Sequence, residues 1–118
     1  ETDQMGVVYY ANFFVYFEMG RTEFLRHLGL PYSEMEKEQI FFPVAEAYCK
    51  FRSPARYDDI LIIQTWISEL KHATVEFSYK IIREEDQKLV AEGFTKLASL
   101  NASRRPTSLP EKLKSLLS

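Results

Sequence analysis

Residues 10–28 carry an apolar stripe that limits how the rest of the chain can fold. The stripe recurs at spacings of three and four residues and consists of Phe13, Phe17, Gly20, Phe24 and Leu28. This spacing is the signature of one face of an α-helix, and Gly29 is well placed to end that helix. A helix with a wide aromatic face must bury it against a second layer of structure.

Strand patterns occupy most of the chain from residue 40 to residue 100. In the clearest case, apolar and polar residues alternate with a period of two, as in a half-buried strand; the apolar members are Val75, Phe77, Tyr79 and Ile81. Further strands are expected over residues 40–52, 60–70 and 89–100, and short helices over 31–37 and 110–117. Sequential strands joined by short loops predict an antiparallel meander. The expected fold is therefore α+β, one domain over residues 1–118 with a curved antiparallel sheet wrapped around a long helix.

Composition narrows the class of protein. A chain of 118 residues holds one core. The net charge of -2 and pI of about 5.7 lack the basic excess of a nucleic-acid binder. No apolar run reaches the roughly 20 residues of a membrane span. The single Cys49 excludes an internal disulfide and a Cys-rich zinc site, and it fits a cytoplasmic setting. Its strand-like surroundings favour a small buried apolar residue over a nucleophile.

An acidic residue stands just before the long helix. Asp3 precedes Gly6, and the helix begins a few residues later. The N–H groups at a helix start are unpaired and can polarise a carbonyl, while a nearby carboxylate can act as nucleophile or general base. Asp3 can equally shape a turn before Gly6. Spacing alone favours the turn, so both interpretations stay open at this point.

Cations gather at two predicted loops. Lys71 and His72 follow one strand, and Arg104 and Arg105 follow the last. Paired cations at strand ends suit phosphate groups, although a solvated loop face has the same composition. The sequence shows no Ser-His-Asp order, Gly-rich phosphate loop or His/Cys cluster, so no metal site is predicted.

Three stretches resemble one family. DQMGVVYYANFFVYFE is similar to the signature of the 4-hydroxybenzoyl-CoA thioesterase family, part of the hotdog-fold superfamily. The matching residues are Asp3, Gly6, Val8, Tyr9, Asn12 and Phe13. PARYDDILIIQTWISEL resembles the family's Tyr-Asp-Asp stretch before a long strand, and RPTSLPEKL resembles its basic residue and proline before a last short helix.

The resemblance implies a hotdog fold and hydrolysis of acyl-CoA thioesters to free acid and CoA, without metal or organic cofactor. It assigns the catalytic carboxylate to Asp3 and the carbonyl-polarising amide to Tyr10. Gly6 belongs to the substrate-binding turn. The CoA phosphates are assigned to Lys71, His72 and Arg105, although His72 and Ala73 stand where some relatives are more basic.

The family forms active sites between subunits, so a homodimer or homotetramer is expected. Family members carry a strand before the acidic motif, and we expect that one preceded residue 1 in the natural protein. Many bacterial members have His where this chain has Tyr10, and an aromatic side chain there suits aryl or longer acyl groups. The acyl group, and the choice between CoA and a carrier protein, stay open.

Two other functions fit the same resemblance. One is a non-catalytic hotdog module that binds acyl-CoA, which the presence of Asp3 and Gly6 disfavours. The other is a dehydratase, which needs a His in the site. His27 falls at the helix end and His72 in a loop, so neither suits that role.

Overall fold

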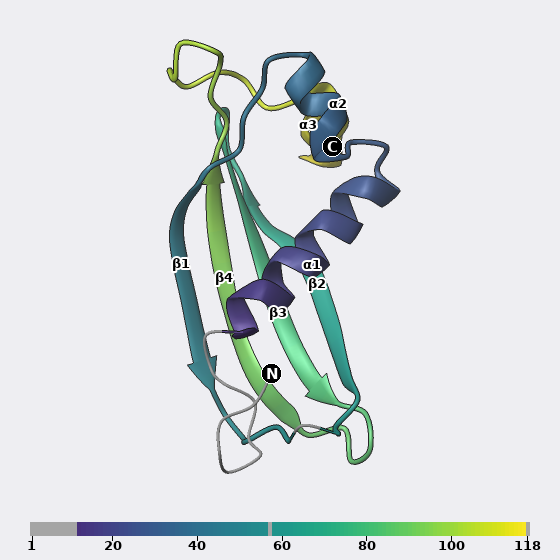
Figure 1. Ribbon diagram of the computed structural model, residues 1–118. Helices are drawn as coiled ribbons and strands as arrows, with labels where there is room; N and C mark the ends of the chain where they lie inside the picture. Colours follow the sequence, from purple (N-terminus) through teal and green to yellow (C-terminus); the bar gives the residue numbers. More distant parts are fainter. Residues whose placement is uncertain (1–11, 57, 118) are drawn as a thin grey trace.

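The computed structural model describes residues 12–56 and 58–117, and its centre is a four-stranded antiparallel sheet with one long helix along one face (Figure 1). Helix α1 spans Asn12–His27 and helix α2 spans Tyr32–Lys37. The strands are β1 (Val44–Phe51), β2 (Leu61–Leu70), β3 (Thr74–Arg83) and β4 (Leu89–Ala98). The chain continues into α3 (Glu111–Lys114) and a 3-10 helix, η1 (Ser115–Leu117). None of the helices in these described ranges is long and apolar enough to cross a membrane.

The long helix is confirmed over the described part of its predicted range. Phe13 and Phe17 are buried as the stripe predicts, and the other members of the stripe are half-buried. The buried face is completed by Arg21 and Leu25, which the predicted stripe omits. Gly29 ends the helix with a φ of +76°, a left-handed conformation that glycine adopts without steric cost.

The alternating strand forms the centre of the core. Val75, Phe77, Tyr79 and Ile81 of β3 are each at most 1% exposed, so the predicted period of two is confirmed. Phe17 of α1 stacks on the ring of Tyr79 with a centroid distance of 4.3 Å, and Phe24 meets Phe77 edge-on at 5.6 Å. Aromatic contacts of this kind add to the free energy gained by burial alone. The helix stripe and the strand stripe thus bury each other.

The predicted meander is wrong at its first strand. Strands β2, β3 and β4 pair in sequence, but β1 pairs with β4, which gives the order β1-β4-β3-β2. The loop after β1 crosses the end of the sheet and leads to β2 at the opposite edge (Figure 1). The prediction placed sequential strands side by side, whereas this loop is long enough to pass beneath two of them. Strand β1 therefore lies at one edge of the sheet and β2 at the other.

Strand β1 is also shorter than predicted. Regular pairing begins at Val44, because Pro43 has no N–H to donate. Before the proline, Phe41 exchanges two backbone hydrogen bonds with Leu100, each with an N–O distance of 2.9 Å. The start of β1 is thereby fixed beside the loop that follows β4.

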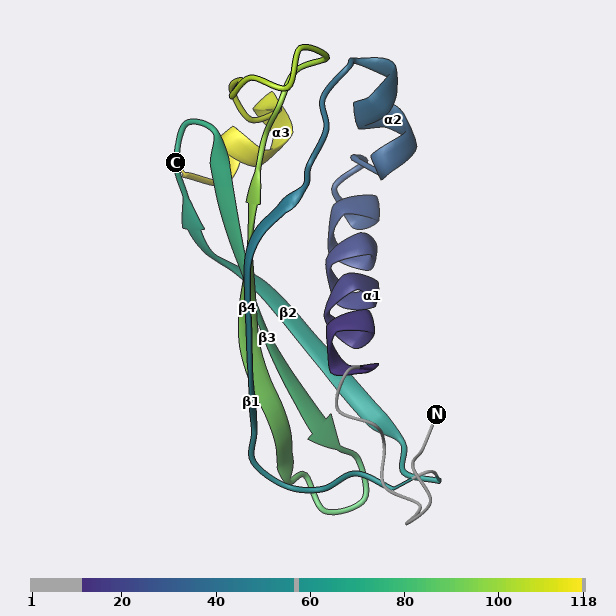
Figure 2. The ribbon, with the colours of Figure 1, turned by 60° about the vertical axis from the view of Figure 1, so that its left-hand side comes forward.

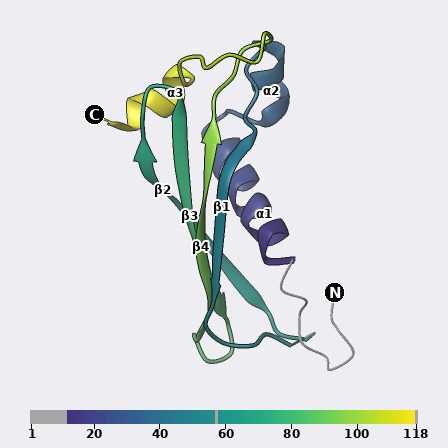
Figure 3. The same ribbon diagram turned by 90° about the vertical axis from the view of Figure 1, so that its left-hand side faces the viewer.

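The two faces of the sheet are covered unequally. Helix α1 lies across one face, and no helix of the described residues covers the opposite face along most of its length (Figures 2 and 3). Helices α2 and α3 lie at the same end of the sheet as the turn between β2 and β3 (Figure 1). The described part of the chain measures 45 × 29 × 21 Å, so the two ends of the sheet are well separated.

Candidate functional site

The residues assigned to catalysis precede the described part of the chain. Asp3, Gly6 and Tyr10 lie outside the described residues, so their predicted roles stay predictions. Their position along the chain is informative, since Tyr10 stands two residues before Asn12, the first residue of α1. The candidate site is therefore built here from what surrounds the start of α1.

The start of α1 lies beside the end of β1. The ring of Phe13 meets the ring of Phe51, the last residue of β1, at a centroid distance of 5.2 Å. From there a groove of about 300 Å³ runs between α1 and β1. We call it the α1 groove, and its lining residues are Phe14, Val15, Glu18, Arg21, Val44, Ala47 and Thr95. Phe14, Val15 and Val44 are 41–50% exposed, so the walls of the groove are largely apolar and open.

A buried cation lies at the base of the α1 groove. The Arg21 side chain is 6% exposed. Its Nε donates to the Tyr32 hydroxyl at 2.9 Å, and its Nη1 donates to the hydroxyls of Tyr79 at 3.2 Å and Thr95 at 3.3 Å. No carboxylate within residues 12–56 and 58–117 forms an ion pair with it. Among the described residues, hydroxyl groups thus surround the buried guanidinium where a counter-ion is more usual.

The surrounding hydroxyls affect the ionisation of this cluster. Burial is the largest influence on the Arg21 pKa and acts to lower it, but Tyr32 and Tyr79 together raise that pKa above its ordinary value. Burial also raises the pKa of Tyr79, and its bonds to Thr95 and Arg21 only partly oppose that. The sequence prediction missed Arg21. A spacing of four residues from Phe13 through Phe17 leads to Arg21, and this spacing places its charge on the buried face of the helix.

The predicted phosphate-binding residues gather at one end of the sheet. Lys71 and His72 lie in the turn between β2 and β3, and Arg105 lies in the loop after β4. The two segments are joined directly, because the Leu109 N–H donates to the His72 carbonyl at 2.9 Å. The structure therefore places Lys71, His72 and Arg105 at the same end of the sheet. We call the two segments the basic loops; their basic residues are Lys71, His72, Arg104 and Arg105.

A second pocket lies beside the loop after β4. It measures about 400 Å³ and is lined by Phe41, Pro43, Leu100, Asn101, Ala102 and Arg104. The Asn101 side chain holds the loop in shape by accepting hydrogen bonds from the N–H groups of Ser103 and Arg105. The pocket offers apolar walls next to an exposed cation, and it opens at the start of β1.

Within one chain the helix start and the basic loops lie apart. The helix start touches the end of β1, whereas the basic loops and the second pocket adjoin its beginning. Eight residues of strand separate the two ends, a length of about 26 Å at 3.3 Å per residue. Figure 1 shows the same separation, with the basic loops above and the start of α1 below.

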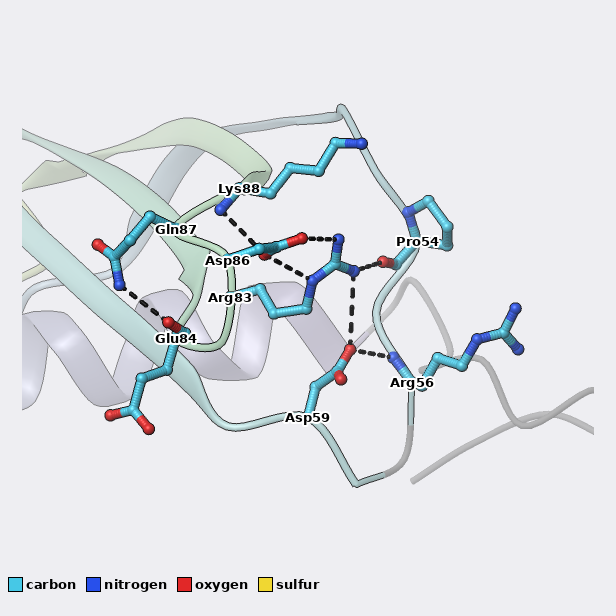
Figure 4. A network of polar contacts seen from close by, with 8 residues as sticks. All are labelled: Pro54, Arg56, Asp59, Arg83, Glu84, Asp86, Gln87 and Lys88. Carbon is cyan, nitrogen blue, oxygen red and sulfur yellow. Dashed lines mark hydrogen bonds and ion pairs between the residues drawn. The ribbon is translucent and has the colours of Figure 1, made fainter.

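The described part of the Tyr-Asp-Asp stretch has a structural role. Asp59 accepts a hydrogen bond from the Arg56 N–H at 2.7 Å and lies 3.8 Å from Arg83 (Figure 4). Arg83 also donates to the Pro54 carbonyl at 2.8 Å and to the Asp86 carboxylate. Asp59 and Arg83 thus fasten the loop that crosses beneath the sheet to the β3–β4 hairpin.

Cys49 is not an activated nucleophile. It lies half-buried on the helix-facing side of β1, and burial raises the pKa of its thiol to about 11. Such a thiol carries little thiolate near neutral pH, which agrees with the sequence prediction. No group of three or more His, Cys, Asp or Glu side chains in the described part of the chain is arranged to hold a metal ion.

Comparison with known proteins points to one family. The thioesterase-like superfamily matches residues 1–117. A protein from Aquifex aeolicus is 40% identical over 72% of this chain and 66% of its own length. Acyl-CoA thioesterase YbgC from Haemophilus influenzae is 31% identical over 97% of this chain and 84% of its own length. The solved structure of a gentisyl-coenzyme A thioesterase superposes with a TM-score of 0.85 and 30% identity, covering 96% of this chain and 90% of that one.

The chain spans only part of the length of some relatives, 66% and 59% for the first two curated proteins that it matches. The match to the superfamily nevertheless runs through almost the whole chain, and the sheet and long helix are those of the solved thioesterase structure. The chain therefore belongs to the thioesterase-like superfamily and has its hotdog fold.

Proposed function

We propose that the protein is an acyl-CoA thioesterase, which hydrolyses the thioester to a free acid and CoA. The observation that carries this proposal is the match to the acyl-CoA thioesterase YbgC across 97% of this chain. The open α1 groove, with apolar walls next to the helix start, supports it because an acyl group needs an apolar site near the reacting carbonyl.

The chemistry is assigned to the segment just before α1. The thioester carbonyl accepts a hydrogen bond from the Tyr10 amide at the helix start, where the helix dipole favours developing negative charge. Asp3 is ionised at neutral pH, given a reference pKa of about 3.9. Its carboxylate either attacks the carbonyl carbon or removes a proton from an attacking water. In both routes the carbon–sulfur bond breaks and CoA leaves as the thiol after protonation.

The two routes differ in whether oxygen from solvent can enter Asp3. If Asp3 attacks, the tetrahedral adduct expels CoA thiolate and becomes an acyl-aspartyl anhydride, which water then hydrolyses. A single turnover in ¹⁸O-labelled water, followed by mass spectrometry of the protein, tests for this route. Label in Asp3 indicates the nucleophile, because water has then attacked the aspartyl carbon of the anhydride. Label in the acid product alone arises from the general base and also from attack of water on the acyl carbon of the anhydride, and trapping the anhydride with hydroxylamine separates these two.

A complete site requires a second copy of the chain. The outer edge of β1 has no strand partner among the described residues over Val44 to Tyr48, and these two residues are 46% and 48% exposed. Unpaired strand edges favour pairing with another chain. We assign a homodimer in which β1 pairs antiparallel with β1 of the second copy.

Such a pair has the geometry that the substrate needs. The two-fold axis exchanges the ends of β1, so the basic loops and second pocket of one copy lie beside the α1 start of the other. CoA phosphates then contact Lys71, His72 and Arg105 of one chain, while the thioester reaches Asp3 and the Tyr10 amide of the other. Gly6 forms the turn between these last two groups and completes the substrate-binding segment.

The test is thiol release from a panel of acyl-CoAs with short, long and aromatic acyl groups. We expect hydrolysis of at least one class and loss of most of that activity in Asp3→Asn, by roughly a hundredfold or more if Asp3 acts as base or nucleophile. Glu36→Gln, an exposed carboxylate on α2, is the matched control and should remain fully active. Tight binding of acyl-CoA with no thiol release would instead establish a non-catalytic binding module.

A further inference from the structure

The cation at the base of the α1 groove has hydrogen-bond donors to spare. A guanidinium carries five N–H bonds. Those of Arg21 donate once from Nε, to Tyr32, and twice from Nη1, to Tyr79 and Thr95. Neither N–H of its Nη2 donates to any described residue. In the described part of the chain, Thr65 Oγ1 alone is fully buried without a partner, so Nη2 is accessible from outside the protein.

This accessible nitrogen belongs to a residue that is otherwise buried. Arg21 is 6% exposed, and it is one of the residues that line the α1 groove. The walls beside it are apolar and include Phe14, Val15, Val44 and Ala47. Polar groups in such surroundings are nearly always paired. The groove therefore has apolar walls and two unused N–H donors at its base.

The positive charge of Arg21 lacks a counter-ion among the described residues. A guanidinium stays protonated in proteins, and the groups that act on this one are the hydroxyls of Tyr32 and Tyr79. Glu18 also lines the groove, but it is exposed and its charge is screened by solvent. Buried charges are ordinarily paired, and a carboxylate is the strongest acceptor for a guanidinium. The base of the groove is thus suited to a carboxylate.

The position of Arg21 on α1 sets how long a bound chain must be. Arg21 stands nine residues after Asn12, the first residue of α1, which is about 13 to 14 Å along the axis. Helical side chains lean back toward the N-terminus, so roughly 10 Å separate a carbonyl at the helix start from a carboxylate at Nη2. A carbon–carbon bond of about 1.5 Å advances an extended chain by about 1.25 Å. The gap is therefore spanned by about eight bonds.

We propose that the preferred acyl group ends in a carboxylate, which accepts hydrogen bonds from Arg21 Nη2 at the base of the α1 groove. The substrate class is then the CoA monothioester of an unbranched dicarboxylic acid with about eight to ten carbons. One carboxyl of the acid forms the thioester, and the other is ionised at neutral pH. The groove of about 300 Å³ is at the lower end of ligand pockets, which suits a single chain. This inference rests on the proposed thioesterase activity and names its substrate.

The first test compares pairs of substrates on the wild-type protein. Each pair consists of two CoA thioesters of equal chain length, one ending in a methyl group and the other in a carboxylate, over roughly four to twelve carbons. At eight to ten carbons we expect kcat/KM to be roughly tenfold or more higher for the carboxyl-ended member, as a hydrogen bond to a charged group implies. At four carbons the preference should disappear, because the chain is too short to contact Arg21.

Variants then assign the preference to Arg21. Arg21→Met removes the donors and the charge, and it should abolish the preference by raising KM for the carboxyl-ended substrate while kcat changes little, because the contact is far from the reacting carbonyl. Arg21→Lys retains the charge and should retain part of the preference. Arg26→Met removes an equal charge from the same helix at an exposed position, and as the matched control it should behave like wild type. Circular dichroism and urea unfolding establish that each variant is folded.

Binding without turnover separates this inference from the proposed activity. Calorimetry compares two stable thioethers, S-octyl-CoA and the same compound with a terminal carboxyl group. Tighter binding of the carboxyl-ended thioether by wild type supports the role of Arg21 even if no thioester is hydrolysed. Equal affinity for the two thioethers, or hydrolysis that ignores the terminal group, overturns the inference and leaves the thioesterase activity in place.

Two further results bear on Arg21 itself. A preference that survives in folded Arg21→Met assigns the carboxylate to another group and overturns the inference. If Arg21→Met does not fold, the wild-type comparison and Arg21→Lys decide, because both keep a cation at the base of the groove.

Discussion

The buried guanidinium of Arg21 is held by hydroxyl groups, and its neighbour Thr95 has a central part in that arrangement. Thr95 Oγ1 lies 2.6 Å from the Tyr79 hydroxyl and accepts from Arg21 at 3.3 Å. Thr65 on β2 offers a contrast, because its buried Oγ1 has no hydrogen-bond partner among the described residues. Two threonines on the helix-facing side of the same sheet thus differ in whether their hydroxyl is satisfied.

Substitution by valine separates these two hydroxyls. Thr95→Val should lower the free energy of unfolding by about 1–3 kcal/mol, because it leaves the buried Tyr79 and Arg21 groups less satisfied. Thr65→Val replaces an unpaired hydroxyl with a methyl group of similar shape. The free energy of unfolding should therefore fall by less than about 0.5 kcal/mol, or should rise. Urea unfolding of both variants gives the comparison. Equal losses would show that the hydroxyl network contributes nothing specific.

At the scale of elements, Gly93 allows α1 and β1 to approach β4. A Cβ built at Gly93 would meet the Tyr48 carbonyl oxygen of β1 and would lie 2.9 Å from Cε2 of Phe17. Gly93→Ala should therefore lower the free energy of unfolding by about 1–3 kcal/mol, as overpacking does in cores. Thermal or urea unfolding measures it.

Gly20→Ala is the companion variant for this prediction. Its added methyl would press on the side chains of Thr65 and Ile63 rather than on backbone, and alanine gains roughly 1 kcal/mol of helix propensity over glycine. It should cost less than Gly93→Ala. The reverse order would contradict the assigned role of Gly93.

The hairpin between β3 and β4 should respond to acid. Hydrogen bonds from Arg83 lower the pKa of Asp86 from its ordinary 3.8 to about 2 (Figure 4). A carboxyl whose pKa is lower in the folded state stabilises the fold above its unfolded pKa, and this contribution disappears as the pH falls through its folded pKa. The stability difference between wild type and Asp86→Asn should therefore be constant near neutral pH and vanish between about pH 4 and pH 2.

Urea unfolding at a series of pH values tests this prediction. In an Arg83→Gln background the same Asp86→Asn substitution should lose most of its pH dependence, because the hydrogen bonds from Arg83 are the largest influence that lowers the pKa and the Lys88 N–H contributes less. A pH dependence of undiminished size after the loss of Arg83 would assign it to another group.

The sequence predicted most elements because each has a local signal. The alternation through Phe77 and Tyr79 depends only on period, and the end of α1 depends only on glycine at position 29. The partner of β1 has no such signal, because strand order is set by how a loop crosses the sheet. The buried Arg21 does have a local signal, the spacing of four from Phe13 and Phe17, but a charged residue in a helix is ordinarily solvated and was therefore left out of the predicted stripe. For the candidate site, the sequence predicted that the basic loops lie at strand ends. Only the fold shows that the two loops lie at the same end of the sheet.

At the scale of the whole molecule, the separation of the α1 start from the basic loops leads to a prediction about mixed dimers. If one chain supplies Asp3 and the other supplies the phosphate contacts, two different inactive variants can complement each other. Asp3→Asn retains the basic loops, and the double variant Lys71→Ala/Arg105→Ala retains Asp3. A mixed dimer of the two then contains one site made only of intact groups and one site that lacks both.

Random exchange of subunits makes half of the dimers mixed, and each mixed dimer has one intact site of two. The mixture should recover about one quarter of the wild-type thiol release, against the residual activity of each variant alone. Exchange is started by partial unfolding in urea and dilution, and each variant treated alone is the control. A site built within one chain predicts no recovery, because every chain of the mixture lacks part of it. Recovery of this size would establish that the site is divided between two chains, as the β1 pairing requires.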